Sequence, residues 1–127
     1  MQDRHLFEYA VIRVVPRVER EEFINVGVIL YCAKKKFLKS VFVIDERRLT
    51  AFSPELDPEE VRSHLESIGL ICNGGKLSGP IGQMDLASKF RWLTATRSTI
   101  VQASKVHPGF CIDPQETLSK LFNDFVL

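Results

Sequence analysis

The sequence has none of the short motifs that mark nucleotide, metal or redox chemistry. Two glycine-containing segments, Asn73-Gly74-Gly75 and Gly79-Pro80-Ile81-Gly82, bracket a loop, but neither has the GxxxxGK[ST] or GxGxxG order of a phosphate-binding loop. The three cysteines are too few and too widely spaced for a CxxC metal site or a disulfide framework. We therefore expect no cofactor, no metal and reduced thiols.

Long apolar runs and a strong excess of one charge are also missing. The longest uncharged stretch, 23–33, is interrupted by Asn25 and is far shorter than the roughly 20 residues of a membrane helix. Charged residues in the first ten positions argue against a secretory leader. The net charge of +1 argues against a continuous nucleic-acid-binding face, although residues 13–48 are locally basic. A cytoplasmic protein without a membrane partner is expected.

The length and composition fit one globular domain. The chain has 127 residues, of which 45% are hydrophobic and 26% charged, and nine phenylalanines supply large core side chains. Cys32 and Cys72 end apolar runs and are predicted to be small core residues, whereas Cys111 falls in a loop-like stretch. We predict a single domain over residues 1–127.

Strand signals dominate the first third of the chain. Nearly continuous apolar, β-branched stretches over 7–15, 23–32 and 37–44 predict three strands, and their short connections favour an antiparallel meander. The second connection is the basic turn 33–36. The β-branched stretch 96–103 predicts one more strand.

Helix signals follow the strands. Asp45, Asp57, Asp85 and Asp113 are predicted N-caps, and a proline follows two of them at the first helical position. The predicted helices run from Asp45 to before Pro54, with Leu49 and Phe52 buried, and over 57–69, 85–93 and 113–125. The lone Trp92 is expected in the core or as a platform for a neighbour. These elements predict an α+β fold, with an antiparallel three- to four-stranded sheet covered by amphipathic helices.

Three residues are unusual for buried strands. If Val15 lies near Phe23, the antiparallel register places Arg13 opposite Asn25 and Val11 opposite Gly27, all on one face. Two interpretations remain open. Arg13, Asn25 and Gly27 form a small polar pocket, or they are structural: Arg13 pairs with Glu21 or Glu22, and Gly27 forms a bulge or admits a bulky neighbour such as Trp92.

Arginines are predicted to gather at one end of the sheet. Their planar guanidinium groups suit carboxylate or phosphate groups. The arginines expected at this end are Arg13, Arg17, Arg20, Arg47 and Arg48, and the candidate binding residues are Arg13, Arg17, Asn25, Gly27, Arg47, Arg48 and Arg97. The leading hypothesis is a non-enzymatic protein that assembles with another cytoplasmic protein through this end.

Two other functions remain open. In the first, the same arginines bind nucleic acid and Lys34, Lys35 and Lys36 add backbone contacts. In the second, a small enzyme acts on an anionic substrate that Arg13 and Arg97 hold, while Asp45 or His107 moves a proton. No catalytic residue is otherwise indicated, and the oligomeric state is not predicted.

The N-terminal pattern resembles a known family. Tyr9-x3-Arg13-x2-Pro16 followed by Glu22-x2-Asn25-Val26-Gly27-Val28-x-Leu30 is similar to the signature of small bacterial proteins grouped as domain of unknown function 3037. Agreement continues through Arg47-Arg48, Arg97-Ser98 and the closing segment from Asp113-Pro114 to Leu121-Phe122. The resemblance implies a cytoplasmic bacterial protein without an established activity. It also implies a tendency to be encoded beside kinase-like proteins that resemble a bacterial persistence toxin, and hence a protein partner.

Overall fold

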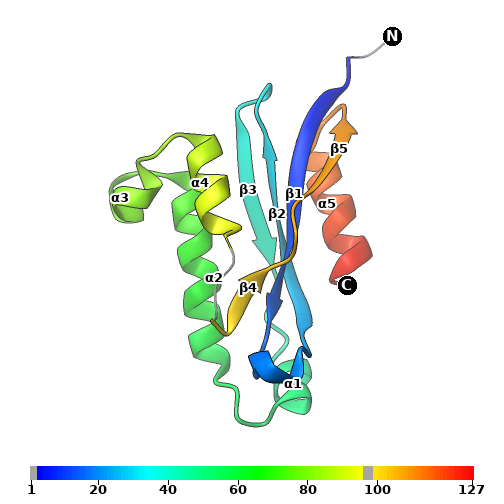
Figure 1. Cartoon of the computed structure of the whole chain (residues 1–127), viewed down its shortest axis with the longest axis vertical. Helices are drawn as coiled ribbons and strands as arrows, with labels where there is room; N and C mark the ends of the chain where they lie inside the picture. Colours follow the sequence, from blue (N-terminus) through cyan, green and yellow to red (C-terminus); the bar gives the residue numbers. More distant parts are fainter. Residues whose placement is uncertain (1–2, 96–98) are drawn as a thin grey trace.

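One antiparallel sheet forms the centre of the molecule. The computed structural model describes residues 3–95 and 99–127, and within these ranges five strands lie in the sheet (Figure 1). The strands are β1 (His5–Val14), β2 (Ile24–Cys32), β3 (Phe37–Phe42), β4 (Val101–Ala103) and β5 (His107–Cys111). The α+β prediction is confirmed, with five strands in place of three or four.

The first three strands form the predicted meander. The sheet order is β3-β2-β1-β4, and β5 also pairs with β1. The turn between β2 and β3 has Lys36 in the left-handed region at φ 51°, and the Lys36 N–H donates to the Ala33 carbonyl over 3.1 Å. Every strand pairing of this sheet is antiparallel.

The edge strand beside β1 is divided into β4 and β5. At the break, the Ser104 N–H donates to the Val11 carbonyl over 2.8 Å, and the Val11 N–H donates to the Ser104 hydroxyl oxygen, also over 2.8 Å. The side chain of Ser104 therefore replaces a backbone acceptor at an irregular position of the sheet. The sequence did not predict β5, because Pro108 and Gly109 are signals of a turn. Residues 96–98 of the predicted strand 96–103 lie outside the described ranges.

Helices cover both faces of the sheet. α1 (Glu46–Phe52), α2 (Pro58–Asn73) and α4 (Leu86–Leu93) lie on one side, and α5 (Pro114–Phe125) lies on the other (Figure 1). The remaining helical segments are short: η1 (Val18–Arg20), η2 (Lys76–Ser78) and α3 (Gly79–Gly82). No helix in the described part of the chain is long and apolar enough to cross a membrane.

All four predicted aspartate N-caps are confirmed. The carboxylates of Asp45, Asp57, Asp85 and Asp113 accept backbone N–H groups at the starts of α1, α2, α4 and α5. The helix α2 continues four residues beyond its predicted end at Gly69. It ends where Gly74 adopts a positive φ of 73°, which an L side chain rarely adopts.

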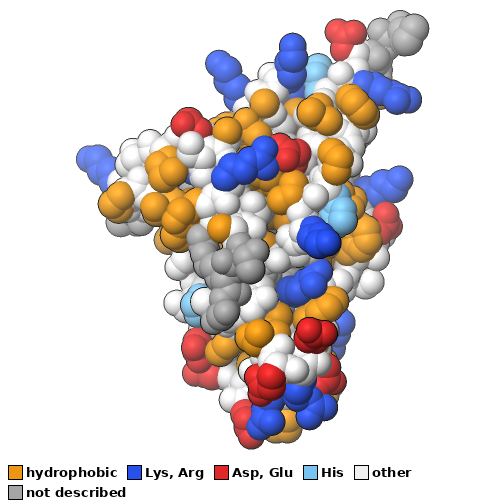
Figure 2. Space-filling view, viewed as in Figure 1, with side chains coloured by type: hydrophobic (Ala, Val, Ile, Leu, Met, Phe, Trp, Pro, Cys, Tyr) orange, Lys and Arg blue, Asp and Glu red, His pale blue; other side chains and the backbone are white. Residues whose placement is uncertain are grey.

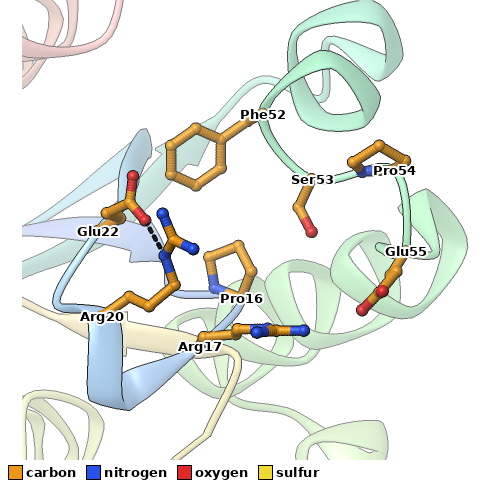
Figure 3. Close-up of a pocket in the computed structure, with 8 residues that line it drawn as sticks. All are labelled: Pro16, Arg17, Arg20, Glu22, Phe52, Ser53, Pro54 and Glu55. Atoms are coloured by element: carbon orange, nitrogen blue, oxygen red, sulfur yellow. Dashed lines mark hydrogen bonds and ion pairs between the residues drawn. The ribbon is translucent and has the colours of Figure 1, made fainter.

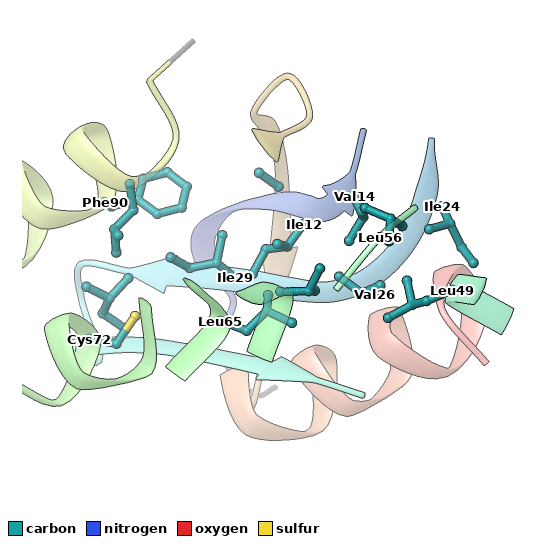
Figure 4. Close-up of a cluster of buried hydrophobic side chains, with 14 residues drawn as sticks. Ile12, Val14, Ile24, Val26, Ile29, Leu49, Leu56, Leu65, Cys72 and Phe90 are labelled. Atoms are coloured by element: carbon teal, nitrogen blue, oxygen red, sulfur yellow. The ribbon is translucent and has the colours of Figure 1, made fainter. Parts of the chain in front are cut away.

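Each face of the sheet has its own hydrophobic core. Under α1, α2 and α4 the core includes Ile12, Ile29, Leu49, Leu65 and Phe90 (Figure 4). Under α5 it includes Phe7, Val28, Leu30, Cys32, Cys111 and Leu118. Because β2 is covered on both faces, its sequence is a nearly unbroken apolar run.

Gly27 lies on the face of α2, opposite the face predicted for it. A β-bulge between Ile12 and Arg13 shifts the register, so Arg13 pairs with Asn25 as predicted but Gly27 pairs with Ile12 and not with Val11. A Cβ at Gly27 would lie 2.5 Å from the Val41 carbonyl oxygen and 3.1 Å from Phe42 Cβ. The glycine therefore permits the close approach of β2 and β3, and it does not share a face of the sheet with Arg13 and Asn25.

The three cysteines are free and buried, and Cys111 ends a strand where a loop was expected. Burial raises the pKa of the Cys72 thiol from 9.0 to about 11, although the charge of Lys89 acts in the other direction. Burial also raises the pKa of Cys111. These shifts favour the neutral thiols and argue against a cysteine nucleophile.

A methyl group at Gly27 is expected to destabilise the fold. Gly27→Ala places a Cβ against backbone that cannot move independently, so the free energy of unfolding should fall by roughly 1–3 kcal/mol. Gly69→Ala is the matched control, because no atom outside its own stretch of helix lies within 4 Å of the position that its methyl group would take. In the middle of α2 it should stabilise by roughly 0.5–1 kcal/mol. Urea denaturation of both variants measures the difference, and equal midpoints would contradict this role of Gly27.

The stability should fall at alkaline pH because of Cys72. The unfolded thiol loses its proton near pH 9, whereas the folded thiol keeps it up to about pH 11. Above pH 9 the unfolded state therefore binds fewer protons, and the stability that the neutral thiol contributes is lost, by roughly 2–3 kcal/mol in total. Denaturation between pH 8 and 11 should show a steeper decline for the wild type than for Cys72→Ala. Parallel pH profiles would show that Cys72 is not the cause.

Candidate functional site

The arginine-rich end of the sheet lies where β1 ends and β2 begins. The segment between these strands contains Pro16 and the short helix η1, and α1 lies beside it (Figure 1). The Val15 N–H donates to the Ile100 carbonyl over 2.6 Å, which ties the start of this segment to the chain before β4. Figure 2 shows acidic and basic side chains gathered together at this lower end of the molecule.

A cavity of about 350 Å³ opens at this end (Figure 3). Arg17 crosses its base toward the side of Glu55, while Arg20 and Phe52 lie on the opposite side. Residues from the β1–β2 connection and from the end of α1 therefore form one site. Its lining consists of Pro16, Arg17, Arg20, Glu22, Phe52, Ser53, Pro54 and Glu55.

The two arginines of the cavity differ in their partners. Arg20 Nε donates to a carboxylate oxygen of Glu22, and both side chains are more than half exposed, so this ion pair adds little stability. Among the residues that the structure describes, no ion pair or side-chain hydrogen bond involves the guanidinium of Arg17 or the carboxylate of Glu55. The donors of Arg17 are thus available to a ligand within an opening that is lined by both charged and apolar side chains.

Asn25 and Arg48 hold the end of α5. Asn25 Nδ2 donates to the Phe125 carbonyl over 3.2 Å, and Arg48 Nη1 donates to the Val126 carbonyl over 3.3 Å. The last carbonyls of a helix have no partner within the helix, so these side chains act as a C-terminal cap. The space beside Asn25 and Arg48 is about 10 Å³, roughly enough for one water molecule. A structural role therefore fits both residues.

Arg13 is also held by its surroundings. Its Cζ atom lies 3.9 Å from the ring centroid of Phe23, a cation–π contact. Burial lowers the pKa of the Arg13 guanidinium. Glu22 pairs with Arg20, and no ion pair joins Arg13 to Glu21 or Glu22 in the described structure. Arg13 Nε and Asn25 Oδ1 are buried and have no hydrogen-bond partner among the described residues.

The remaining candidates are more dispersed. Arg47 is exposed on α1, and Arg97 lies outside the described residues. The lysines 34–36 are at the other end of β2 from Arg17, about 30 Å away for a nine-residue strand. One continuous basic face that joins the arginines to these lysines is therefore not formed.

The two residues suggested for proton transfer, Asp45 and His107, lie on different elements, at the N-cap of α1 and in β5. Asp45 accepts a backbone N–H as the N-cap of α1. His107 pairs with Tyr9, which is four residues, or about 13 Å, from Arg13 along β1. Within the described ranges no group of three or more histidine, cysteine or acidic residues is placed to hold a metal.

Sequence reasoning missed half of the cavity. It identified Arg17 and Arg20, but it placed Phe52 on the buried side of α1, whereas Phe52 is 36% exposed and lines the opening. A large apolar residue followed by Ser53-Pro54 was a usable signal, because proline ends a helix and exposes its last turn. The proximity of residues 52–55 to residues 16–22 depends on the fold and has no local signal.

Removing the cap on α5 should weaken the last turn of this helix. Asn25→Ala leaves the Phe125 carbonyl without its side-chain donor and should lower the free energy of unfolding by about 1 kcal/mol. Amide hydrogen exchange should also accelerate in the last turn of α5. Asn123→Ala, on the exposed side of the same helix, should change the stability by less than about 0.5 kcal/mol. Equal effects of the two substitutions would contradict the capping role of Asn25.

Comparison with known proteins gives a family without a known activity. No curated protein and no solved structure matches the chain. A family model described as "Protein of unknown function (DUF3037)" matches residues 9–126, which include the cavity, the sheet except for the first four residues of β1, and all the helices that cover it. The resemblance seen in the N-terminal motif is thereby confirmed over nearly the whole chain, and the protein belongs to the DUF3037 family.

Proposed function

We propose that this protein is a non-enzymatic interaction protein that binds an acidic segment of another protein at the cavity around Arg17. The observation that carries the proposal is the guanidinium of Arg17, which has no ion-pair partner in the described structure and lies in an opening of about 350 Å³. Arginine in such a position forms two parallel hydrogen bonds to one carboxylate.

The walls of the cavity support a protein ligand. Pro16, Phe52 and Pro54 provide apolar surface around the charged group. Arginine and aromatic residues are enriched in protein interfaces, where a few such side chains carry most of the binding free energy. An aspartate or glutamate next to an apolar residue in the partner fits this combination.

The acidic residues of the lining argue for a carboxylate over a polyanion. Glu22 and Glu55 face the same cavity as Arg17 and Arg20, so the formal charges of its lining cancel. A nucleic-acid backbone gains affinity from several unopposed positive charges, and these carboxylates would repel it. One carboxylate beside Arg17 avoids that repulsion, while a basic residue of the partner would complement Glu55.

The family suggests where to look for the partner. The resemblance to this family implies that its members tend to be encoded beside kinase-like proteins, so a cytoplasmic kinase-like protein encoded near this chain is the first partner to test. Binding would assemble, recruit or inhibit that protein, and no reaction at the cavity is required.

Charge reversal at Arg17 tests the proposal. Tagged protein is incubated with the purified kinase-like candidate or with a partner captured from a lysate of the native host and then purified, and affinities are measured by calorimetry. Arg17→Glu should weaken binding by about tenfold or more, because it removes a bidentate contact and repels the carboxylate. Raising the salt concentration should weaken binding by the wild type only modestly.

The matched control is Arg4→Glu. Arg4 is exposed and lies before β1, at the opposite end of that strand from Arg17, so the substitution changes the net charge equally without touching the cavity. It should leave the affinity within about twofold. Equal loss in both variants, equal binding by Arg17→Glu and wild type, or binding only of oligonucleotides with a steep salt dependence would overturn the proposal.

A further inference from the structure

A second cavity lies between the sheet and the helices α2 and α4, and it shares no lining residue with the arginine site. We propose that it binds a small bicyclic aromatic compound that carries one hydrogen-bond donor at the mouth of the cavity. The proposal is independent of the protein-binding function proposed above.

The floor and walls of this cavity are apolar. Ile12 of β1 and Ile29 of β2 form the floor, and both are at most 2% exposed. Their side chains belong to the core shown in Figure 4. Five elements contribute to the lining, together with Ala95 and Thr99, which lie on either side of residues 96–98, outside the described ranges. The apolar wall residues are Ile68, Ile71, Trp92, Leu93, Val101 and Ala103.

The size of the cavity selects the ligand. Its volume is about 370 Å³, within the range of roughly 300–1,000 Å³ that is usual for small-molecule sites. An apolar cavity of about 150 Å³ stays dry and accepts one benzene ring. A cavity more than twice that large has room for two fused rings, and the aromatic residue Trp92 is among those that line it.

Polar side chains mark the mouth. His64 and Ser67 line the cavity from α2, one helical turn apart, and both are exposed, in contrast to the buried floor. The Ser67 hydroxyl donates to the Ser63 carbonyl over 3.0 Å, so its oxygen remains able to accept a bond from a ligand. A ligand can place its rings against Ile12 and Ile29 at the floor. Its hydroxyl or amine group can then donate a hydrogen bond to Ser67 at the mouth.

A ligand in this open space should also stabilise the folded protein. Side chains around an unfilled apolar space lack contact atoms on one side, and a bound ring system restores those contacts. A ligand that binds only the folded state raises the apparent stability in proportion to the logarithm of its concentration above the dissociation constant. Binding should therefore raise the Tm and should also change the NMR signals of residues that line the cavity.

The lone tryptophan allows a direct test with 2-naphthol as the probe. The chain has one Trp, so a ¹⁵N-labelled sample gives one indole N–H signal, and it belongs to Trp92 in the wall of the cavity. Titration with 2-naphthol should shift this signal saturably and should raise the Tm. 2-Methoxynaphthalene, which has the same rings but no donor, should bind about threefold to tenfold more weakly.

A pair of serine variants decides the location. Ser67→Phe fills the mouth and should weaken binding of 2-naphthol by about tenfold or more, since an added ring occupies the space of the ligand. Ser63→Phe is the control: it is exposed on the same helix, one turn earlier, and does not line the cavity. It should bind as the wild type does, and circular dichroism checks that both variants fold.

Three results would overturn the inference. The first is the absence of a saturable shift of the Trp92 signal up to the solubility limit of 2-naphthol. The second is an equal shift in Ser67→Phe and Ser63→Phe, which would indicate adsorption elsewhere on the surface. The third, equal affinity for 2-naphthol and 2-methoxynaphthalene, would refute the hydrogen-bonding mouth.

Discussion

The pairing of β1 with β2 is the interaction on which the rest of the structure depends. β1 binds β2 along one side and both β4 and β5 along the other, so every strand except β3 is a direct neighbour of β1. The two strands are also the floor of the apolar cavity and the origin of the connection that carries Arg17. A change in their register would displace both candidate sites at once.

The bulge in this pairing places the residues on its two sides on opposite faces of the sheet. It leaves Arg13 and Asn25 facing the side of α5 while Gly27 faces the side of α2. On the first side the amide of Asn25 can reach the end of α5. On the second side a residue without a side chain lets β2 approach β3 closely. One irregular position thus meets two different packing demands.

Local signals predicted much of the fold. The aspartate caps, the apolar runs and the basic turn each depend on interactions within a few residues, and the structure confirms them. Opposition of Arg13 and Asn25 was also predictable, because a short connection fixes a register near its own end. The error arose only beyond the bulge, where Gly27 shifted by one position.

Features that depend on distant segments were not predictable in the same way. β5 contains Pro108 and Gly109, and only its pairing with β1 makes it a strand. The cavity around Arg17 needs residues 16–22 and 52–55 to meet, and Phe52 lines it from the end of α1. Trp92 was expected in the core or as a platform, but it is 39% exposed in the wall of a cavity whose floor comes from residues far away in sequence.

The divided edge of the sheet has a consequence for self-association. Straight, unpaired edge strands recruit further strands and promote aggregation. Here β4 and β5 are short, the backbone between them turns aside at Ser104, and Pro108 has no N–H to offer to an incoming chain. This border of the sheet is therefore a poor template for strand addition. At high concentration, a second copy of the chain should not pair with it readily.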